Sequence, residues 1–498
     1  MHSWLKNVVI VLLPAILITG CSNPQREMNR LMQAYARQDL FSGTVLVAEG
    51  DHILYTEAFG WADRQDSIPM TLDTRFRIGS ISKPFTAQII NQLIAENQLS
   101  PQDTIGHLYP DYAGEGARRI IVDQLLKHTS GIIPHLSDDE EAIAEKKPHS
   151  LDDLVGYAEQ SPLLFEPGSA FKYSNYGYAL LAGIAVQVTR LPFYQLLESR
   201  VFKPLGLKNT GHFRSTNTAA PMAQGYEYDL LQGYLCADSI DLSYAQGYGD
   251  ITSTAEDLWT WYRHLDIHAS FMSIDDPVSP VTRAGWFKST LTFPNTGKKI
   301  EVFEHSGSIN GFGSYLVHAP ERDIVVIVLK NFRSNNYLQP VYAPAIAREL
   351  LACMYDFPVE LPRKSVGLEL ARRIGEEQQE DLPVFYQKLK KYNSSDLNFS
   401  EPELNKLGIE LLFKYERPEM AAEVFKVNML EFPESYNTYD SYAYALLMMQ
   451  DTVGAIEAYR KGFEVYDLYP AINQTESNMR NRKTATELVG TLESELVP

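Results

Sequence analysis

The sequence has few cysteines and no tract of basic residues. Three cysteines among 498 residues are too few for a disulfide framework or a four-thiolate zinc site. The 63 acidic side chains outnumber the 44 basic ones, and the formal net charge of -19 argues against a nucleic-acid partner. Hydrophobic residues make up 45% of the chain, which excludes wholesale disorder and a protein with many membrane spans. Composition leaves a soluble enzyme or a binding protein and does not choose between them.

Three familiar catalytic signatures are also missing. The chain has no G-x-S-x-G nucleophile elbow, no G-x-x-x-x-G-K-[ST] phosphate loop and no H-E-x-x-H zinc helix. His264 and His268 stand four residues apart on an expected helix, a spacing compatible with a metal. Because no third ligand is evident, we interpret them as an exposed polar face, and we expect no metal and no organic cofactor.

The N-terminal segment resembles a bacterial lipoprotein signal. Lys6 precedes a short apolar run, Val8 to Ile18, that is too brief for a comfortable membrane span, and small residues then lead to Cys21. We expect residues 1–20 to be a signal peptide and Cys21 to be the lipidated N-terminus, anchored in the cell envelope on a periplasmic or outer-membrane face. An ordinary secretory peptide and an uncleaved anchor are the alternatives. Cys236 and Cys353 remain as a pair that could join across a long stretch of sequence.

The rest of the chain divides into an α+β region and a helical region. Period-2 alternation predicts a hairpin over 43–60 and strands over 299–305, 313–319 and 323–330. Apolar periodicity predicts helices over 28–37, 84–97, 151–160, 176–189, 193–201 and 255–265, the last opened by a capping signature at Ser253 and Glu256. Strands at both ends, with helices between, predict an α+β domain over 22–357 whose terminal strands share one antiparallel sheet.

Beyond this region the patterns are helical, and an internal repeat appears. The run Ala421 to Phe425 matches Ala455 to Tyr459 at an offset of 455 - 421 = 34, the tetratricopeptide period. We therefore predict an all-α, tetratricopeptide-like domain over 366–498 that offers a surface for a protein partner. Two copies are fewer than the usual three, so flanking helices would have to cap them; plain helical hairpins are the alternative.

One short stretch carries the clearest catalytic pattern. A strand-like segment runs into Gly79 and then into a helix that opens with Ser80-Ile81-Ser82-Lys83. A serine hydroxyl is a poor nucleophile until a base takes its proton, and a lysine of lowered pKa can do so. One helical turn brings Lys83 back to the face of Ser80. A second S-x-x-K, Ser169 to Lys172, shows that the pattern also arises by chance.

Two later segments supply partners for this pair. Tyr173-Ser174-Asn175 is the only Y-x-N in the chain; a tyrosine can relay protons near a lysine, and an asparagine can orient a lysine and a substrate amide. His305-Ser306-Gly307-Ser308 ends a predicted strand, and its glycine lets a ligand approach the backbone. Each has a structural alternative: a helix cap for Ser80, a loop aromatic for Tyr173, a surface position for His305. Their order and spacing favour a site.

These motifs, together with Leu125 to Gly131, resemble the serine β-lactamase-related hydrolases in the family order. That family includes class C β-lactamases, D-alanyl-D-alanine carboxypeptidases, D-aminopeptidases and esterases. The resemblance covers about residues 40 to 355. It implies a β-lactamase/transpeptidase-like fold, in which helices flank an antiparallel sheet and a helical subdomain adjoins it, with the site in the cleft between.

The resemblance also implies roles for single residues. Ser80 is the expected nucleophile, Lys83 its partner in proton transfer, and Tyr173 the general base or relay; whether Lys83 or Tyr173 accepts the proton during acylation stays open. Asn175 is expected to steady Lys83 and the substrate amide. Backbone amides of Ser80 and Ser308 are expected to form the oxyanion hole, beside the substrate-binding segment His305, Ser306 and Gly307.

One position departs from the penicillin-processing members. Where they carry Lys-Thr-Gly or Lys-Ser-Gly, this chain has His305-Ser306-Gly307. That lysine gives a fixed positive charge for a substrate carboxylate, whereas a histidine is mostly neutral at pH 7. We therefore expect an exported serine hydrolase that acts on a D-amino-acid peptide or an ester, with β-lactams ranked last.

A binding protein is the rival interpretation. In it, the same fold serves as a catalytically silent ligand sensor, with the C-terminal helices docking partners. We also expect that a chain ending near Leu361 still folds and acylates, because few contacts usually cross such a boundary.

Overall fold

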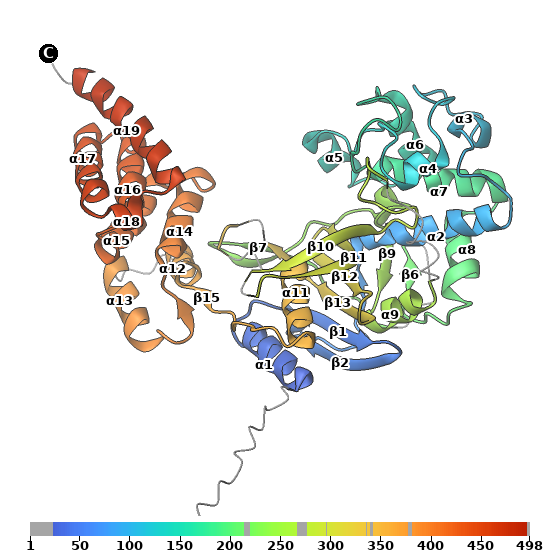
Figure 1. Ribbon diagram of the computed structural model, residues 1–498, viewed down its shortest axis with the longest axis horizontal. Helices are drawn as coiled ribbons and strands as arrows, with labels where there is room; N and C mark the ends of the chain where they lie inside the picture. Colours follow the sequence, from blue (N-terminus) through green and yellow to red (C-terminus); the bar gives the residue numbers. More distant parts are fainter. Residues whose placement is uncertain are drawn as a thin grey trace, which may run out of the picture.

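The central element is a six-stranded antiparallel sheet in the order β10-β11-β12-β13-β1-β2 (Figure 1). The computed structural model describes residues 23–213, 220–265, 276–294, 296–334, 336–338, 342–376 and 381–495. Cys21, the predicted signal peptide and His268 lie outside these ranges. The strands of this sheet are β1 (Gly43–Glu49), β2 (His52–Phe59), β10 (Phe287–Phe293), β11 (Lys298–Ile309), β12 (Phe312–Ala319) and β13 (Ile324–Lys330).

The predicted closure of the sheet by its terminal strands is confirmed. β1 pairs antiparallel with β13, with Val45 opposite Val328 and Val47 opposite Val326. Both strands are buried because helices cover both faces: α1 (Pro24–Arg37) and α11 (Ala343–Met354) on one, α2 (Ser82–Ala95) and α9 (Ala255–Arg263) on the other. Burial on both faces explains why β13 reads as a continuous apolar run rather than an alternation.

The helical subdomain lies between α2 and α9 in the sequence and packs on α2 (Figure 1). Its long helix α7 (Asn175–Thr189) is buried over most of its length. Shorter helices surround α7: α3 (Ile105–Leu108), α4 (Val122–Leu126), α5 (Asp138–Ala144), α6 (Leu151–Gln160) and α8 (Phe193–Leu197), which continues into a π-helical turn Glu198–Phe202.

Short strands link these layers. They form the sheets β5 (Phe76–Arg77), β9 (Ile251–Ser253) and β6 (Gly211–His212); β14 (Phe332–Ser334), β7 (Tyr226–Asp229) and β8 (Gly233–Cys236); and β3 (Trp61–Asp63) with β4 (Ile68–Pro69). The predicted capping signature was wrong by one residue. The N-cap of α9 is Thr254, whose side chain accepts from the backbone N–H of Asp257, because Ser253 still belongs to β9.

The C-terminal region is helical and stands beside the sheet region, joined to it through the chain around β15 (Lys364–Ser365) (Figure 1). β15 pairs in parallel with β16 (Leu397–Asn398). The helices are α12 (Val366–Gly375), α13 (Leu382–Tyr392), α14 (Glu401–Phe413), α15 (Pro418–Glu431), α16 (Tyr436–Met448), α17 (Thr452–Leu468), α18 (Pro470–Asn473) and α19 (Glu476–Glu495).

The two copies of the 34-residue repeat fall on α15 and α17. Ala421 and Ala455 are fully buried, as are the aromatic positions Phe425 and Tyr459 to within 3%. Each copy packs against the preceding helix, α14 or α16, and α19 covers α17 and α16. The tetratricopeptide character and the limits 22–357 and 366–498 stay predictions.

Cys236 is exposed, Cys353 is buried, and both are free thiols. Within the described ranges no single helix has the length and hydropathy to cross a bilayer. Among the same residues, one pair of helical segments passes by length and composition, Asn175–Thr189 with Phe193–Phe202, and this pair is bent by 82°.

Candidate active site

The Ser80–Lys83 pair lies at the start of α2, against the end of β11. β5 leads through Gly79, which takes a left-handed φ of +52, into the short helix η1 (Gly79–Ile81) and then α2. A side chain at Gly79 would place its Cβ 2.9 Å from the backbone nitrogen of Ser308, so glycine allows this close approach. Lys83 Nζ donates a hydrogen bond of 3.1 Å to Ser80 Oγ.

Lys83 is fully buried and enclosed by aromatic rings. Its Nζ also donates to the backbone carbonyl of Tyr248 at 3.1 Å, and it lies 4.7 Å from the ring centre of Tyr173. Burial lowers the pKa of this amine well below its ordinary value. The site thus favours the neutral amine, which can accept a proton from the neighbouring hydroxyl. Sequence reasoning missed Tyr248, since a backbone carbonyl leaves no residue signature.

Tyr173 stands directly before α7 and stacks on His128. The two ring centres are 4.4 Å apart, and His128 Nδ1 accepts a 3.0 Å hydrogen bond from the backbone N–H of Ser174. Burial raises the pKa of Tyr173, and a hydrogen bond with the Ser80 side chain acts in the opposite direction. Burial, with the nearby Lys83 and His305, lowers the pKa of His128. A phenol beside a neutral amine can pass protons without holding charge.

Asn175 begins α7, where its backbone N–H donates to the carbonyl of Pro134 at 3.0 Å. Its Oδ1 is buried and has no hydrogen-bond partner within the described part of the chain. In the same part of the chain Lys83 bonds to Ser80 and Tyr248, and the role of Asn175 in steadying Lys83 and the substrate amide stays a prediction.

His305 points from β11 into the buried face of the sheet. Its ring centre lies 5.5 Å from Phe287 and 6.4 Å from Tyr173. Burial, together with Lys83, lowers the pKa of His305 to about 3, so the ring is neutral at pH 7. Its Nδ1 contacts the carbonyl of Ser306 at 2.7 Å, while its Nε2 is buried without a partner in the described ranges.

The next residues of β11 bring its backbone against η1. A Cβ on Gly307 would lie 1.9 Å from the carbonyl oxygen of Ile78, and Ser314 Oγ donates to that same oxygen at 2.7 Å. Ser306 and Ser308 are exposed on the opposite face of the strand from His305. The register thus leaves the backbone of Ser308 beside Gly79 and Ser80.

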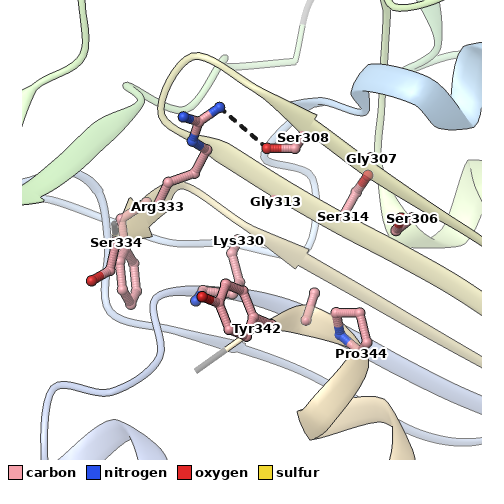
Figure 2. A pocket seen from close by; sticks show the side chains of 12 residues that line it. Ser306, Gly307, Ser308, Gly313, Ser314, Lys330, Arg333, Ser334, Tyr342 and Pro344 are labelled. Atoms are coloured by element: carbon pink, nitrogen blue, oxygen red, sulfur yellow. Dashed lines mark hydrogen bonds between the residues drawn. The ribbon is translucent and has the colours of Figure 1, made fainter. Parts of the chain in front are cut away.

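A pocket of about 370 Å³ extends from this strand end toward the start of α11 (Figure 2). Ser306 and Ser308 line it from β11, and the buried Lys330, the half-buried Arg333 and the exposed Tyr342 line it as well. Burial lowers the pKa of Lys330 to about 7. Arg333 Nη1 donates to Ser308 Oγ at 3.2 Å. Sequence reasoning missed both basic residues, because Lys330 ends a strand that shows only an apolar pattern and Arg333 lies in a strand too short to show a period.

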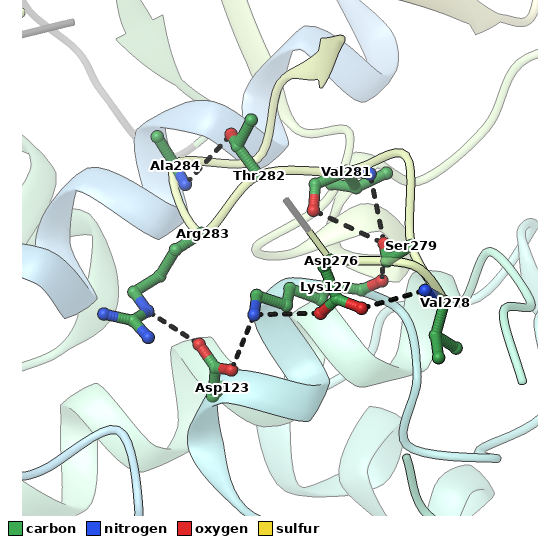
Figure 3. Close-up of polar contacts among 9 residues, drawn as sticks. All are labelled: Asp123, Lys127, Asp276, Val278, Ser279, Val281, Thr282, Arg283 and Ala284. Atoms are coloured by element: carbon green, nitrogen blue, oxygen red, sulfur yellow. Dashed lines mark hydrogen bonds and ion pairs between the residues drawn. The ribbon is translucent and has the colours of Figure 1, made fainter. Parts of the chain in front are cut away.

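A network of ion pairs anchors the segment that leads into β10 (Figure 3). Lys127 Nζ lies 2.9 Å from Asp123 and 3.0 Å from Asp276, and Arg283 Nε lies 2.6 Å from Asp123. This segment carries Trp286, whose ring stacks on Trp261. The ring centres of Trp286 and His305 are 6.5 Å apart. The Leu125–Gly131 motif therefore contributes a structural anchor, Lys127, and a ring beside Tyr173, His128.

The second S-x-x-K is not part of this arrangement. Ser169 and Lys172 are exposed, and Ser169 Oγ donates to the carbonyl of Glu166 at 2.7 Å. His264 contacts the carbonyl of Thr260 through Nδ1. No group of three or more His, Cys, Asp or Glu side chains suited to a metal occurs within the described ranges.

The sequence matches the Beta-lactamase family over residues 28–350, well over half of the chain. The chain belongs to this family. Among curated relatives, it is similar to Penicillin-binding protein 4* of Bacillus subtilis (strain 168), with 27% identity over 365 residues, 68% of this chain and 78% of that protein. It is 25% identical to Protein flp of Staphylococcus aureus (strain N315) over 347 residues, 66% of each chain.

Solved structures agree with the fold. The D-amino acid amidase of Ochrobactrum anthropi SV3, in complex with L-phenylalanine amide, superposes with a TM-score of 0.56 at 23% identity, over 66% of this chain and 99% of that one. The D-stereospecific amidohydrolase of a Streptomyces species gives 0.52 at 25% identity, over 62% and 94%. The predicted family and fold class are confirmed: a β-lactamase and penicillin-binding-protein-like sheet with helices, followed by a helical segment.

Proposed function

We propose that this protein is an exported serine hydrolase that cleaves an amide or ester through a covalent acyl-enzyme on Ser80. The family is one of serine hydrolases. The observation that carries the proposal for this chain is the 3.1 Å hydrogen bond between Ser80 Oγ and a fully buried Lys83 whose pKa is lowered. A cation buried without a carboxylate is costly, and activation of a nucleophile is what such a lysine offers.

In the acylation step, Ser80 Oγ attacks the substrate carbonyl carbon while its proton moves to the neutral Lys83 amine. The negative charge that develops on the carbonyl oxygen is stabilised by the backbone N–H groups of Ser80 and Ser308. The directions of the two pKa shifts favour Lys83 as the acceptor and the neutral Tyr173 as the relay that returns the proton to the leaving amine or alcohol.

Hydrolysis then reverses these roles. A water molecule loses a proton to the Lys83–Tyr173 pair, its oxygen attacks the acyl ester, and the Ser80 oxygen leaves with a proton. The products are the carboxylic acid and the free serine hydroxyl. Two coupled groups titrate as a pair, so a pH profile of this reaction reports both residues together.

For the substrate we propose a D-amino-acid amide or peptide, or a short ester, with little turnover of β-lactams. His305 is uncharged and occupies the position where penicillin-processing members carry lysine, so a carboxylate finds no fixed charge there. The relatives include penicillin-binding proteins, a D-amino acid amidase and a D-stereospecific amidohydrolase, which supports an amide next to a D-centre.

The test is a substrate profile of the wild type and of Ser80→Ala. One chromogenic cephalosporin, one D-alanyl dipeptide, one D-amino-acid amide and one short-chain ester suffice. We expect Ser80-dependent release from the amide, the dipeptide or the ester, and far slower release from the cephalosporin. Rapid cephalosporin hydrolysis that Ser80→Ala abolishes would overturn the substrate assignment. Activity that survives Ser80→Ala would overturn the mechanism.

Attachment to the envelope is a separate part of the proposal. Cys21 as the lipidated N-terminus places the hydrolase at a membrane surface, where cell-wall peptides are near. Cys21→Ser is expected to abolish incorporation of a labelled fatty acid and to release the protein from the membrane fraction; unchanged labelling would contradict the anchor. A protein partner for the C-terminal helices stays a prediction.

A further inference from the structure

Two short strands outside the main sheet join the C-terminal helices to the end of β11. β14 and β7 pair in parallel, with Arg333 beside Glu227. β7 continues into the β7–β8 turn, which reaches the helices, and β14 continues into residues 336–338, which also reach them. Glu227 of β7 contacts the turn that follows β11, and Arg333 of β14 contacts Ser308 of β11, while the segments that follow the two strands contact the helices.

On the catalytic side, Glu227 and Arg333 hold the turn between β11 and β12. Glu227 Oε1 accepts a 3.0 Å hydrogen bond from the backbone N–H of Gly311 and forms a 3.2 Å ion pair with Arg333 Nε. Arg333 in turn donates to Ser308 Oγ at 3.2 Å (Figure 2). Gly311 takes φ +74, and a Cβ there would meet the backbone of Gly225 at 2.6 Å. The turn between β11 and β12 is therefore hydrogen-bonded to β7 and packs closely against the backbone that leads into β7.

On the helical side, Tyr415 hydrogen-bonds to the β7–β8 turn. Its hydroxyl donates to Asp229 Oδ2 at 2.8 Å and accepts from the backbone N–H of Leu230 at 3.0 Å. Leu230 is 1% exposed and belongs to the same apolar cluster as the helices. The backbone of Leu231 comes so near Gly375 that a Cβ on that glycine would lie 1.9 Å from the Leu231 carbonyl oxygen.

A second contact reaches β14. Glu410 Oε1, on α14, accepts a 2.8 Å hydrogen bond from the backbone N–H of Tyr337. The next residue, Leu338, is buried in the same cluster, and its side chain lies 2.7 Å from where a Cβ on Gly367 would be. Glu410 near the end of α14 and Tyr415 just after it therefore contact the residues that follow β14 and the end of β7, the two strands that carry the Glu227–Arg333 pair.

We propose that Tyr415, acting through the Glu227–Arg333 pair, is a positioning residue for the oxyanion hole, and that the C-terminal helices thereby tune acylation at Ser80. This inference rests on the proposed function. Oxyanion donors act only when they are held at the place where charge develops. Residues 305–308 of β11 extend beyond the last pair with β10, Phe287 opposite Glu304, so within the described residues one edge of the strand has no neighbouring strand at Ser308. The contacts of Arg333 with Ser308 Oγ and of Glu227 with Gly311 are therefore expected to help fix this end of the strand.

The kinetic test compares Tyr415→Phe with Tyr392→Phe in the full chain. Tyr392 lies on α13, is 72% exposed and serves as the matched control. We expect Tyr415→Phe to lower the acylation rate by about tenfold at nearly unchanged KM, since small displacements of a catalytic group cost up to about a hundredfold. An arylboronic acid forms an adduct with Ser80 that places an oxygen in the oxyanion hole. We expect its binding affinity to fall by the same factor.

Glu227→Gln refines this comparison. Glutamine keeps an acceptor for Gly311 but removes the ion pair with Arg333, so a smaller loss is expected than for Glu227→Ala. Equal acylation rates and equal boronic acid affinities in Tyr415→Phe, Glu227→Ala and the wild type would overturn the proposal. A loss in Tyr392→Phe as large as that in Tyr415→Phe would also overturn it, because the effect would then be general.

A measurement independent of activity separates this proposal from the proposed function. Hydrogen–deuterium exchange of the wild type and both tyrosine variants reports the backbone amides of 305–313. We expect faster exchange there in Tyr415→Phe only, and no change in β1 and β2; unchanged exchange at 305–313 would overturn the proposal. If the wild type shows no acylation at all, the proposed function fails. The exchange data alone then decide whether Tyr415 holds residues 305–313 in place.

Discussion

The polar side chains around Ser80 are buried together, and burial sets the charge of each. Lys83 and His305 lose affinity for a proton, while Tyr173 holds its proton more tightly. All three shifts favour the neutral form, so these three side chains carry little charge before the substrate oxygen develops one. That arrangement suits acyl transfer, because the largest stabilisation is kept for the transition state.

The neutral His305 gives an expected dependence of stability on pH. Its pKa is about 3 in the folded protein and near 6.5 when unfolded, so between these values the unfolded chain binds more protons. The free energy of unfolding therefore falls as the pH drops below about 6.5, by about 2 kcal/mol at pH 5 from this residue. His128 acts in the same direction. Urea unfolding at pH 7.5 and at pH 5 measures this change in the free energy of unfolding.

The variant for this test is His305→Gln, with the exposed His107→Gln as control. His305→Gln is expected to lose less stability between pH 7.5 and pH 5 than the wild type, whatever its stability at pH 7.5. Wild-type pH dependence in His305→Gln would contradict the buried neutral histidine.

At the scale of single residues, the sequence indicated the candidate catalytic residues but not the residues that contact and position them. Ser80, Lys83 and Tyr173 could be proposed because their types and spacing are chemical signatures. Arg333, Glu227 and the carbonyl of Tyr248 could not, because each owes its place to a strand pairing or a loop far away in the sequence. The choice between the two S-x-x-K motifs came from the order of the surrounding motifs in the sequence; in the structure Lys83 is enclosed and Lys172 is exposed.

At the scale of elements, the site depends on how closely β11 approaches η1. Glycines on both sides make the contact: Gly307 faces the carbonyl of Ile78, and Gly79 faces the backbone of Ser308. The predicted strands and most helices agree with the structure to within a few residues, since their apolar periods are strong. Apart from the strand-like segment before Gly79, which is β5, the strands of the small sheets β5-β9-β6 and β14-β7-β8 were not predicted, because two to four residues are too short to show a period.

Gly307→Ala tests this contact. The added methyl group would lie 1.9 Å from the carbonyl oxygen of Ile78, so β11 and η1 must separate. We expect a loss of about 1–3 kcal/mol in the free energy of unfolding, typical of overpacking, and a severe loss of Ser80 acylation. Gly313→Ala, in the partner strand and with nothing within 4 Å of its Cβ, should unfold near the wild-type midpoint. Similar midpoints and rates for Gly307→Ala and the wild type would contradict the contact.

At the scale of the molecule, the C-terminal helices and the sheet region meet mainly at the β7–β8 turn and after β14. The sequence predicted a separate helical unit from its change in composition and its 34-residue offset. It could not predict where the unit docks, because docking depends on single side chains such as Tyr415 and Glu410. The composition argument also could not reveal a link between the helices and the catalytic strand.

A chain that ends at Leu361 tests whether the C-terminal helices are needed for the sheet region to fold or only for positioning the oxyanion hole. We expect it to remain folded by circular dichroism and to label at Ser80, because few contacts usually cross a boundary of this kind. Because Tyr415 and Glu410 are gone, labelling should be about tenfold slower than in the full chain. Aggregation would mean that the helices complete the catalytic fold, and labelling at the full rate would contradict their positioning role.

The central claim is that Ser80 is the acylated nucleophile, and mass mapping of a covalent adduct tests it most directly. The full-length wild type and Ser80→Ala are each treated with a serine-reactive fluorophosphonate and with a fluorescent penicillin, then digested. We expect the fluorophosphonate to give one adduct, on Ser80, that is absent in Ser80→Ala, with Ser169 unmodified in both. An adduct on Ser169, or none on Ser80 with either reagent, would contradict the account.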